Sequence, residues 1–307
     1  MEGSYLFISD VHSNWPALRA VLKDARRWTE RYGEFTGKVC LGDTVGYGPY
    51  ARKCVRRVRG EGFLSIAGNH DVAVVEDGCS HFNSDAKEAV ELNIEDLKGE
   101  RRQNCMTYLK GLSPKPVFDP RGRFGFVHGS FTGLSRFGEI IVPVDYGYEG
   151  QYITDPDEAI FAMHAMKVKT DTGTVHVPIG FVGHTHIPLH TAYRTRYVDG
   201  KPAEVDKESL TLRYYLAENY TNGMGPVFDI VPSREGGWIT QHIINFGSVG
   251  QPRNESPHAC YGIAIFRGDG SVNIQFRSVA YPVEETQRKM IEQGFPEDSV
   301  SRLECGR

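Results

Sequence analysis

The chain has 307 residues, of which 40% are hydrophobic and 24% charged, and its formal net charge is -4 at pH 7. This composition allows a sizeable buried core. The slightly acidic balance argues against a general nucleic-acid binder and against a protein held by charge on an anionic membrane. No apolar run reaches the roughly 20 residues that cross a bilayer, so we expect no membrane partner.

The amino-terminal segment and the cysteines both favour a cytoplasmic location. The first apolar run is preceded by Glu2 and stops at Asp10, which is not the pattern of a signal peptide. Six cysteines are dispersed without a C-x-x-C pair, namely Cys40, Cys54, Cys79, Cys105, Cys260 and Cys305. Free thiols in a reducing compartment fit this usage better than a disulfide framework or a cysteine-ligated zinc site.

Strands and helices alternate in the first third of the chain. The apolar run at residues 5–9 predicts a buried strand, and helical spacing follows at 15–31, where Asn14 and Pro16 are start signals. The elements predicted next are a strand at 37–43, a helix at 51–60 closed by Gly60, a strand at 62–71 that runs into a loop, helical sequence from 83 to about 112, and a strand at 123–129.

Beyond residue 186 the pattern changes to short runs rich in Thr, Tyr and Val. The runs at 211–217, 238–246 and 261–279 are separated by Gly, Asn and Asp, which predicts antiparallel strands and hairpins. The tail from residue 282 returns to helical spacing. Because no repeat, low-complexity block or linker interrupts the chain, we expect one domain over residues 1–307.

The apolar runs share a feature at their carboxyl ends, where each is followed at once by Asp, His or Asn. The motifs are SDVHSN, LGD, GNHD, VHG and GHTH, and their candidate ligands are Asp10, His12, Asp43, Asn69, His128, His184 and His186. Strand carboxyl ends form the edge where ligands bind in open α/β sheets. Oxygen and nitrogen donors without thiolates suit manganese, iron or zinc. Seven donors exceed one tetrahedral site and suit two ions that share a carboxylate.

The series D-x-H, G-D, G-N-H-D, V-H-G and G-H-T-H, in this order, resembles the calcineurin-like metallophosphoesterase superfamily. The stretches at 81–93, 244–263 and 278–297 are similar to its compact bacterial and archaeal branch of predicted phosphodiesterases. The resemblance implies an α/β (α+β) fold, a four-layer sandwich of two mixed β-sheets flanked by helices. It does not extend to about 131–174 and 191–237, which we expect to be insertions that set specificity.

The resemblance also implies a role for each motif residue. Asp10, His12 and His186 would bind a first divalent metal ion. A second ion would be bound by Asn69, His128 and His184, with Asp43 bridging the two. A hydroxide that bridges the metals would then attack phosphorus.

Two residues next to the predicted ligand Asn69 are expected to be catalytic. His70 would face the substrate and donate a proton to the leaving oxygen or stabilise the phosphoryl oxygens. Asp71 adjoins it in sequence and would orient or charge its ring.

The predicted function is hydrolysis of a small phosphoester, nucleotide-like or organic, by a phosphodiesterase or phosphatase. Serine/threonine phosphatases of the superfamily carry an arginine soon after the G-D motif, whereas this chain has Tyr47 in GDTVGYGP. The alternatives are a protein phosphatase of that type and a non-catalytic metal-binding scaffold of the same fold. Nucleic acid is not expected as a bulk partner, and the sequence does not indicate an oligomeric state.

Three residues are candidates for substrate binding, each with a structural alternative. Asn14 contacts phosphate or caps the helix behind it. Arg253 binds phosphate through its fork of donors or forms an incidental ion pair. For Tyr47 the same two alternatives remain, which are substrate binding and a structural role. The aromatic segment 145–152 forms a substrate wall or packs on itself. The histidines without a motif are expected to be structural or surface residues, namely His81, His164, His176, His190, His242 and His258.

Overall fold

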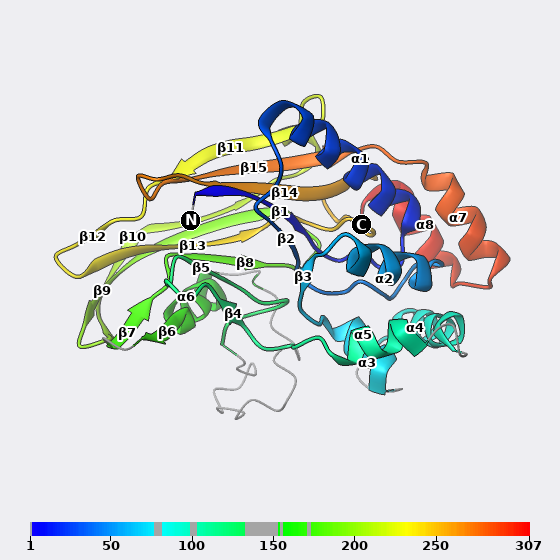
Figure 1. The fold of residues 1–307 in the computed structure, drawn as a ribbon, viewed down its shortest axis with the longest axis horizontal. Coiled ribbons are helices and arrows are strands. Elements are labelled where there is room, and N and C mark those ends of the chain that lie inside the picture. Colours follow the sequence, from blue (N-terminus) through cyan, green and yellow to red (C-terminus); the bar gives the residue numbers. More distant parts are fainter. Residues whose placement is uncertain (1, 77–81, 99–102, 133–152, 154–155, 171–172) are drawn as a thin grey trace.

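The computed structural model describes residues 2–76, 82–98, 103–132, 153, 156–170 and 173–307 (Figure 1). Its helices are α1 (Trp15–Tyr32), α2 (Ala51–Gly60), α3 (Asn69–Glu76), α4 (Ser84–Leu97), α5 (Gln103–Lys110), α6 (Pro156–Ala165), α7 (Val283–Glu292) and α8 (Glu297–Cys305). Its strands are β1 (Gly3–Ile8), β2 (Gly37–Cys40), β3 (Leu64–Ser65), β4 (Val117–Phe118), β5 (Phe124–Phe126), β6 (Lys167–Thr170), β7 (Gly173–His176), β8 (Ile179–Val182), β9 (Leu189–Val198), β10 (Lys201–Tyr214), β11 (Met224–Ile230), β12 (Arg234–Glu235), β13 (Trp238–Asn245), β14 (Ala259–Phe266) and β15 (Val272–Val279).

The strands form two mixed sheets and a separate hairpin, β6–β7. The first sheet has the order β11-β15-β14-β1-β2-β3, in which β1, β2 and β3 are parallel. The second has the order β10-β9-β13-β8-β5-β4, in which β13, β8 and β5 are parallel and β12 pairs with β13. The remaining pairings are antiparallel.

Three apolar layers hold the sheets and helices together. Between the two sheets the rings of Phe7 and Phe181 stack with their centroids 4.1 Å apart, and Phe246 and Phe276 fill the space beside them. Helix α1 covers the outer face of the first sheet, and α6 covers the outer face of the second. The order is helix, sheet, sheet, helix, which confirms the predicted four-layer fold. Strands covered on both faces are continuously apolar, as the fully buried β8 illustrates.

The parallel strands of both sheets end at the same side of the sandwich. The loops that follow β1, β2 and β3 in one sheet and β5, β8 and β13 in the other meet there. Helices α2 to α5 form an additional apolar cluster next to these loops, in which Val45 packs with Val55, Val74 and Leu97. The motif residues are therefore delivered to one region from two sheets.

The chain around the GNHD motif differs from the prediction. Strand β3 covers only Leu64–Ser65, and the expected loop is the first turn of α3, which begins at Asn69. Gly68 precedes the helix: its carbonyl accepts the N–H of Val72 at 3.1 Å, and its N–H donates to the Asp71 carboxylate at 3.0 Å. The Asp71 carboxylate thus reaches back to the backbone N–H of the residue before the helix, which is the half of a capping box that the third helical residue supplies, and it begins a helix where apolar periodicity gives no signal.

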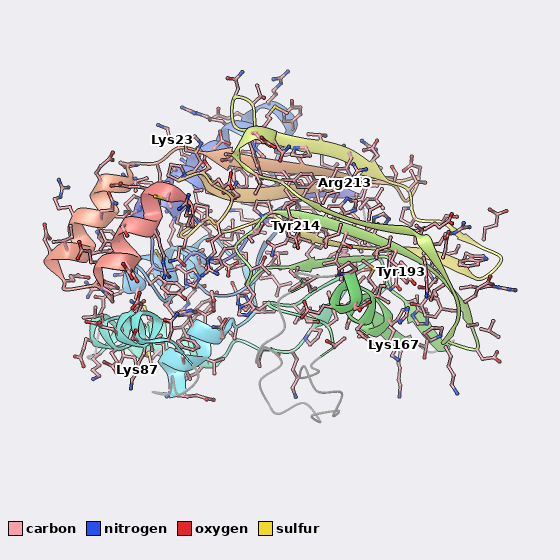
Figure 2. All side chains as sticks on the ribbon, turned by 180° about the vertical axis from the view of Figure 1, so that it is seen from behind. Lys23, Lys87, Lys167, Tyr193, Arg213 and Tyr214 are labelled. Carbon is pink, nitrogen blue, oxygen red and sulfur yellow. The ribbon has the colours of Figure 1, made fainter. Side chains whose placement is uncertain are left out.

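The two expected insertions are described to different extents. Most of 131–174, including the aromatic segment 145–152, lies outside the described residues. The segment 191–237 forms most of β9, all of β10 and β11, and β12; Figure 2 shows the back of the molecule with Arg213 and Tyr214 on β10. Register shifts and charged residues along β10 are typical of protected edge strands. A role of either insertion in specificity stays a prediction.

Neither a membrane-spanning helix nor a disulfide is expected from the sequence, and the described part of the chain bears on both. None of its helices combines the length and the apolar character that a transmembrane span requires. The five described cysteines are free thiols; four are buried, and Cys305 is exposed. Cys79 lies outside the described residues.

Candidate metal centre

All seven predicted metal ligands lie together at the common carboxyl end of the parallel strands. Six of them, together with His70, form three overlapping groups whose ligand atoms lie within 4.8 Å of one another: Asp10, His12 and His186; Asp43, His128 and His184; and His12, Asp43 and His70. Every member of these groups is buried. Converging buried carboxylates and imidazoles are the arrangement that a metal site requires.

The first group joins the loops after β1 and β8. The Nε2 atoms of His12 and His186 are 2.9 Å apart. One carboxylate oxygen of Asp10 lies 3.3 Å from Nε2 of His186 and 3.9 Å from Nε2 of His12. These three ligand atoms therefore face one point, although His12 and His186 are 174 residues apart in the chain.

The second group joins the loops after β2, β5 and β8. Nε2 of His128 lies 3.2 Å from Oδ2 of Asp43 and 3.1 Å from Oδ1 of Asn69. The ring of His184 lies 5.1 Å from the ring of His128, centroid to centroid. Asn69 thus contributes an amide oxygen to this group from the first turn of α3.

Asp43 connects the two groups. Its Oδ2 atom lies 3.7 Å from Nε2 of His12 and 3.2 Å from Nε2 of His128. Its Oδ1 atom accepts the backbone N–H of His70 at 2.8 Å, at the positive end of α3. Burial alone would raise the pKa of Asp43, but the neighbouring histidines, His128 foremost, hold it well below its usual range. The carboxylate is therefore ionised and shared between the groups.

Backbone carbonyls determine the tautomer of three of the histidines. Nδ1 of His12 lies 3.1 Å from the Val45 oxygen, that of His128 lies 2.7 Å from the Leu41 oxygen, and that of His186 lies 2.8 Å from the Gln251 oxygen. A carbonyl oxygen only accepts hydrogen bonds, so each Nδ1 carries the proton. Each Nε2 is then directed to the shared centre, where its lone pair binds a metal whenever the ring is neutral.

The charge states of these histidines follow from burial and from Asp43. Burial lowers the pKa of His12 and His186, which keeps both rings neutral near pH 7. At His128 burial acts in the same direction, but the Asp43 carboxylate outweighs it and raises the pKa to about 9. A proton and a metal cation therefore compete for Nε2 of His128, and binding of a cation would release that proton.

The backbone of the ligand loops is strained. Five of the predicted ligands have positive φ although none is glycine: Asp10 (52°), His12 (44°), Asp43 (51°), His184 (67°) and His186 (62°). A non-glycine residue in this region costs of order 1–3 kcal/mol and persists where surrounding contacts hold it, most often at functional sites. The strain sends consecutive side chains of one loop toward a common centre.

The family model for calcineurin-like phosphoesterases matches residues 3–199. The chain belongs to this family. It is 27% identical over 98% of its length to an uncharacterised protein of Methanocaldococcus jannaschii, of which the match covers 97%. A crystal structure of a metallophosphoesterase from Sphaerobacter thermophilus is 30% identical over 100% of both chains, with a TM-score of 0.68. A hypothetical protein from Pyrococcus horikoshii shares the fold at 15% identity over 99% of this chain and 98% of its own, with a TM-score of 0.64.

Divalent metals fit the residues that this family member brings together. The centre contains two buried carboxylates, an amide oxygen and histidines. In His12 and His186 the proton lies on Nδ1, so Nε2 is unprotonated and able to bind a metal. No cysteine takes part in any of the metal-binding groups found among the described residues. The donor set is that of borderline divalent ions such as manganese, iron or zinc.

His70 lies against the first group with aromatic rings on both sides. Its ring centroid is 4.8 Å from that of His12, 4.6 Å from Tyr47 and 4.6 Å from Phe82. Only 4% of its surface is exposed, and its Nδ1 atom has no hydrogen-bond partner among the described residues. The close approach requires Gly46 (φ 101°), because a Cβ atom there would lie 2.4 Å from Nδ1 of His70. Phe82 is not among the predicted site residues, because its stretch, 81–93, indicates only the family resemblance.

The structure places the Asp71 side chain on backbone amides and not against the His70 ring that it was expected to orient. Its carboxylate accepts backbone N–H groups from Thr44 at 3.0 Å, Val45 at 3.2 Å and Gly68 at 3.0 Å, and it does not bond to the His70 ring. Burial and the nearby Asp43 carboxylate raise its pKa to about 7. Adjacent side chains in the first turn of a helix point in different directions, so Asp71 holds two loops together and does not orient its neighbour.

All polar atoms of the Asn14 side chain form hydrogen bonds within the protein. Its Oδ1 atom caps α1 at the N–H of Ala17 (3.2 Å) and accepts from Thr286 (2.9 Å). Its Nδ2 group donates to the Gly250 carbonyl at 2.9 Å and to the Tyr281 hydroxyl at 3.0 Å. The side chain is 1% exposed. The capping alternative is therefore the one that the structure favours, and substrate contact is not.

Arg253 and Tyr47 remain at the site. The Arg253 backbone N–H donates to the His186 carbonyl at 3.2 Å, and its guanidinium lies 3.4 Å from the side-chain oxygen of Gln251. The positive charge of Arg253 contributes, after burial, to lowering the pKa of His186. Tyr47 is half-buried, and its ring lies 4.8 Å from that of His12. Both side chains border the metal-binding groups.

Sequence reasoning missed the residues that support the loops. Asn93 on α4 accepts hydrogen bonds from the Gly46 N–H (3.0 Å) and the Ser13 hydroxyl (2.5 Å) and donates to the Gly48 carbonyl (3.0 Å). Asn245 at the end of β13 donates to the Gly183 carbonyl at 2.7 Å. Asn93 sits in a polar helix, where nothing in the local pattern distinguishes a buried asparagine from a solvated one.

Proposed function

We propose that this protein hydrolyses phosphoester bonds of small substrates with the help of two divalent cations, one at each donor group. The observation that carries the proposal is the position of Asp43, whose Oδ2 atom lies within 3.7 Å of Nε2 of His12 and 3.2 Å of Nε2 of His128. A carboxylate that lies between two sets of donors distinguishes a two-cation site from a single-ion site.

The residues that would bind the cations follow from the groups. Asp10, His12 and His186 would hold one ion, Asn69, His128 and His184 the other, and Asp43 both. Cations bound there supply positive charge that polarises phosphoryl oxygens and lowers the pKa of water. The buried, strained loops would hold the donors in place and exclude bulk solvent around them.

His70, Arg253 and Tyr47 are the proposed substrate-facing residues. The His70 ring would donate a hydrogen bond to the leaving oxygen, and Tyr47 and Phe82 on its two sides would keep it in position. Arg253, held toward the site by Gln251, would bind a phosphoryl oxygen through its fork of donors. These roles require no protein nucleophile, since water attacks phosphorus.

The proposed substrates are small phosphodiesters or organic phosphates, nucleotides included. Tyr47 follows the G-D motif where protein phosphatases of the superfamily have an arginine, which weakens the protein-phosphatase alternative. Free, mostly buried cysteines support the proposal that the enzyme works in a reducing cytoplasm.

The test counts bound metal and measures turnover on one preparation. Protein stripped with a chelator is loaded with Mn²⁺, analysed for metal by mass spectrometry, and assayed with bis(p-nitrophenyl) phosphate and p-nitrophenyl phosphate. We expect two ions per chain and hydrolysis that depends on them. A maximum of one ion under any loading would refute the two-cation site. Two ions without turnover of any ester in a broad panel would favour the non-catalytic scaffold.

A further inference from the structure

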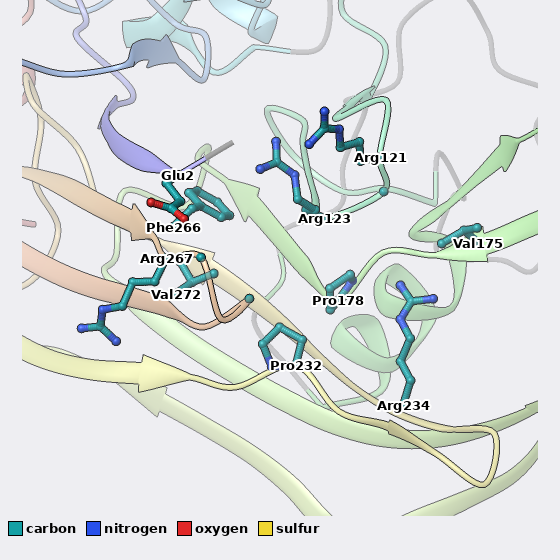
Figure 3. A pocket seen from close by; sticks show the side chains of 13 residues that line it. Glu2, Arg121, Arg123, Val175, Pro178, Pro232, Arg234, Phe266, Arg267 and Val272 are labelled. Carbon is teal, nitrogen blue, oxygen red and sulfur yellow. The ribbon is translucent and has the colours of Figure 1, made fainter.

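The sandwich has a cavity at the end opposite the metal-binding loops. It has a volume of about 520 Å³ and opens between the two sheets, where Glu2 precedes β1, Pro178 precedes β8 and the β14–β15 turn begins (Figure 3). The six residues of β1 separate Glu2 from the loop of Asp10, a span of about 20 Å. The volume falls within the roughly 300–1,000 Å³ typical of small-molecule sites.

Four arginines border this cavity, and two of them are neutralised by carboxylates. The Arg123 guanidinium forms a two-point pair with Asp119, through Nε at 2.8 Å and Nη2 at 2.6 Å. Arg267 pairs with Asp229 at 3.1 Å, and Figure 3 shows its side chain directed away from the other arginines. These two contribute walls to the cavity and little net charge.

Arg121 and Arg234 have no carboxylate partner among the described residues. Arg121 is exposed on the turn between β4 and β5, beside Arg123. Arg234 is exposed at the start of β12, and its Nη2 group donates to the His176 carbonyl at 2.8 Å. Its other N–H groups have no acceptor in the part of the chain that the structure describes. Figure 3 shows the two on different walls, with the Arg234 guanidinium turned toward Val175. One acidic side chain, that of Glu2, also lines the cavity, and it lies beside Gly268.

The surface between these arginines is apolar. Val175, Pro178, Pro232, Phe266 and Val272 line it. Phe266 also packs beneath the Arg123 guanidinium, which lies 5.7 Å from its ring centroid. A cavity with guanidinium donors on two walls and an apolar floor suits a molecule with an anionic group on an apolar body.

We propose that this cavity binds a small organic phosphate monoester, with Arg121 and Arg234 holding the phosphate and the apolar floor contacting the organic group. The forked N–H donors of a guanidinium match the geometry of phosphate oxygens. A carboxylate paired with either arginine would compete with the phosphate for these donors. The site is separate from the metal centre and does not depend on hydrolysis there.

The experiment titrates the protein with adenosine 5′-monophosphate by calorimetry in the presence of EDTA, so that hydrolysis does not consume the probe. Saturable binding with one site is expected. Adenosine, which lacks the anion, and inorganic phosphate, which lacks the apolar body, should each bind at least roughly tenfold more weakly. Binding of inorganic phosphate as tight as that of the nucleotide would overturn the role of the floor, and equal binding of adenosine would overturn the role of the arginines.

Variants decide which of the two ends of the sandwich is occupied. The double variant Arg121→Ala/Arg234→Ala should bind the nucleotide at least tenfold more weakly, and Arg234→Glu should abolish binding. Arg253→Ala, which removes the arginine at the metal centre, should bind it as the parent does. The reverse pattern, or no binding of the nucleotide at millimolar concentration, would overturn the proposal. Both substituted residues are exposed, and unfolding temperatures measured alongside should stay close to that of the parent.

Discussion

The Nε2 atoms of His12 and His186 face each other at 2.9 Å, while the Nδ1 atom of each ring donates to a backbone carbonyl. Because both rings are neutral, two lone pairs point at the same space, which is unfavourable until a positive charge lies near them. Cation binding should therefore stabilise the folded protein as well as enable chemistry.

We expect Mn²⁺ to raise the unfolding temperature of chelator-treated protein. At a free metal concentration of about 100 times the dissociation constant, each site should add about 2.7 kcal/mol to the free energy of unfolding. His12→Ala should lose much of this gain, whereas His258→Ala, at an exposed histidine, should keep it. Equal metal-induced shifts in the two variants, measured by thermal unfolding, would contradict the assignment of His12.

Asp43→Asn should lose metal and activity together. The substitution keeps the side-chain shape but removes the negative charge that the two donor groups share. Loss of several kcal/mol of charge stabilisation corresponds to a fall in kcat/KM of roughly 10²-fold or more. Metal analysis and turnover on the same sample check this, with Asp157→Asn, at an exposed position on α6, as the control. A variant that kept both ions at parental affinity would exclude a bridging role.

His70→Ala should keep both ions but slow turnover by roughly 10²–10⁴-fold. The loss should be greatest for esters with poor leaving groups, since the ring is proposed to assist departure of the oxygen. The His70 ring also lies near enough to His12 and Asp43 to act as a ligand. Metal analysis separates these roles, because loss of an ion in the variant would make His70 a ligand.

Asn93→Ala should destabilise the fold and the site together. The substitution leaves the buried Gly46 N–H and Gly48 carbonyl without their side-chain partner. Each unsatisfied group costs about 1–3 kcal/mol, so we expect the free energy of unfolding, measured with urea, to fall by about 2–6 kcal/mol. Turnover should fall because Gly46 and Tyr47 share this loop. Asn104→Ala, at an exposed position of α5, should change the unfolding free energy little.

A histidine pair away from the metal centre should make the protein sensitive to acid. His190 on β9 and His242 on β13 lie 3.0 Å apart, Nε2 to Nδ1, and the His190 ring stacks on Phe228. Burial lowers the pKa of His190 to about 4, with the charge of Arg213 adding to the effect, and burial lowers the pKa of His242 to about 3, with His190 adding to the effect. The unfolded chain, with pKa values near 6.5, therefore binds protons first as the pH falls.

Stability contributed by this pair should be complete above pH 6.5 and decline between pH 6.5 and about 4. Urea unfolding at pH 7.5 and pH 5.0, in one metal state, measures the decline. His242→Asn should show a decline smaller by on the order of 1 kcal/mol, because the metal-site histidines contribute to both proteins alike. Identical declines in parent and variant would show that the pair does not titrate as expected.

Local patterns in the sequence were sufficient for the elements whose packing is regular. The helix predicted at 15–31 is α1 (Trp15–Tyr32), and that at 51–60 is α2 (Ala51–Gly60), because apolar spacing and end signals are local properties. The start of α3 at Asn69 was not predicted. Its capping carboxylate, Asp71, is held in turn by backbone groups of Thr44 and Val45, which no local pattern reveals.

The sequence by itself determined which donor types follow each parallel strand, because a strand's apolar run and the polar residues after it are contiguous. Only the tertiary structure decided which of those donors converge. It placed Asp43 between the two donor groups and Asp71 on backbone amides. It also placed Asn14 at the α1 cap, with its amide group held by Gly250 and Tyr281. The physical reason is that a side chain's role depends on which atoms satisfy it, and those atoms come from other loops, which for Asn14 are more than 200 residues away.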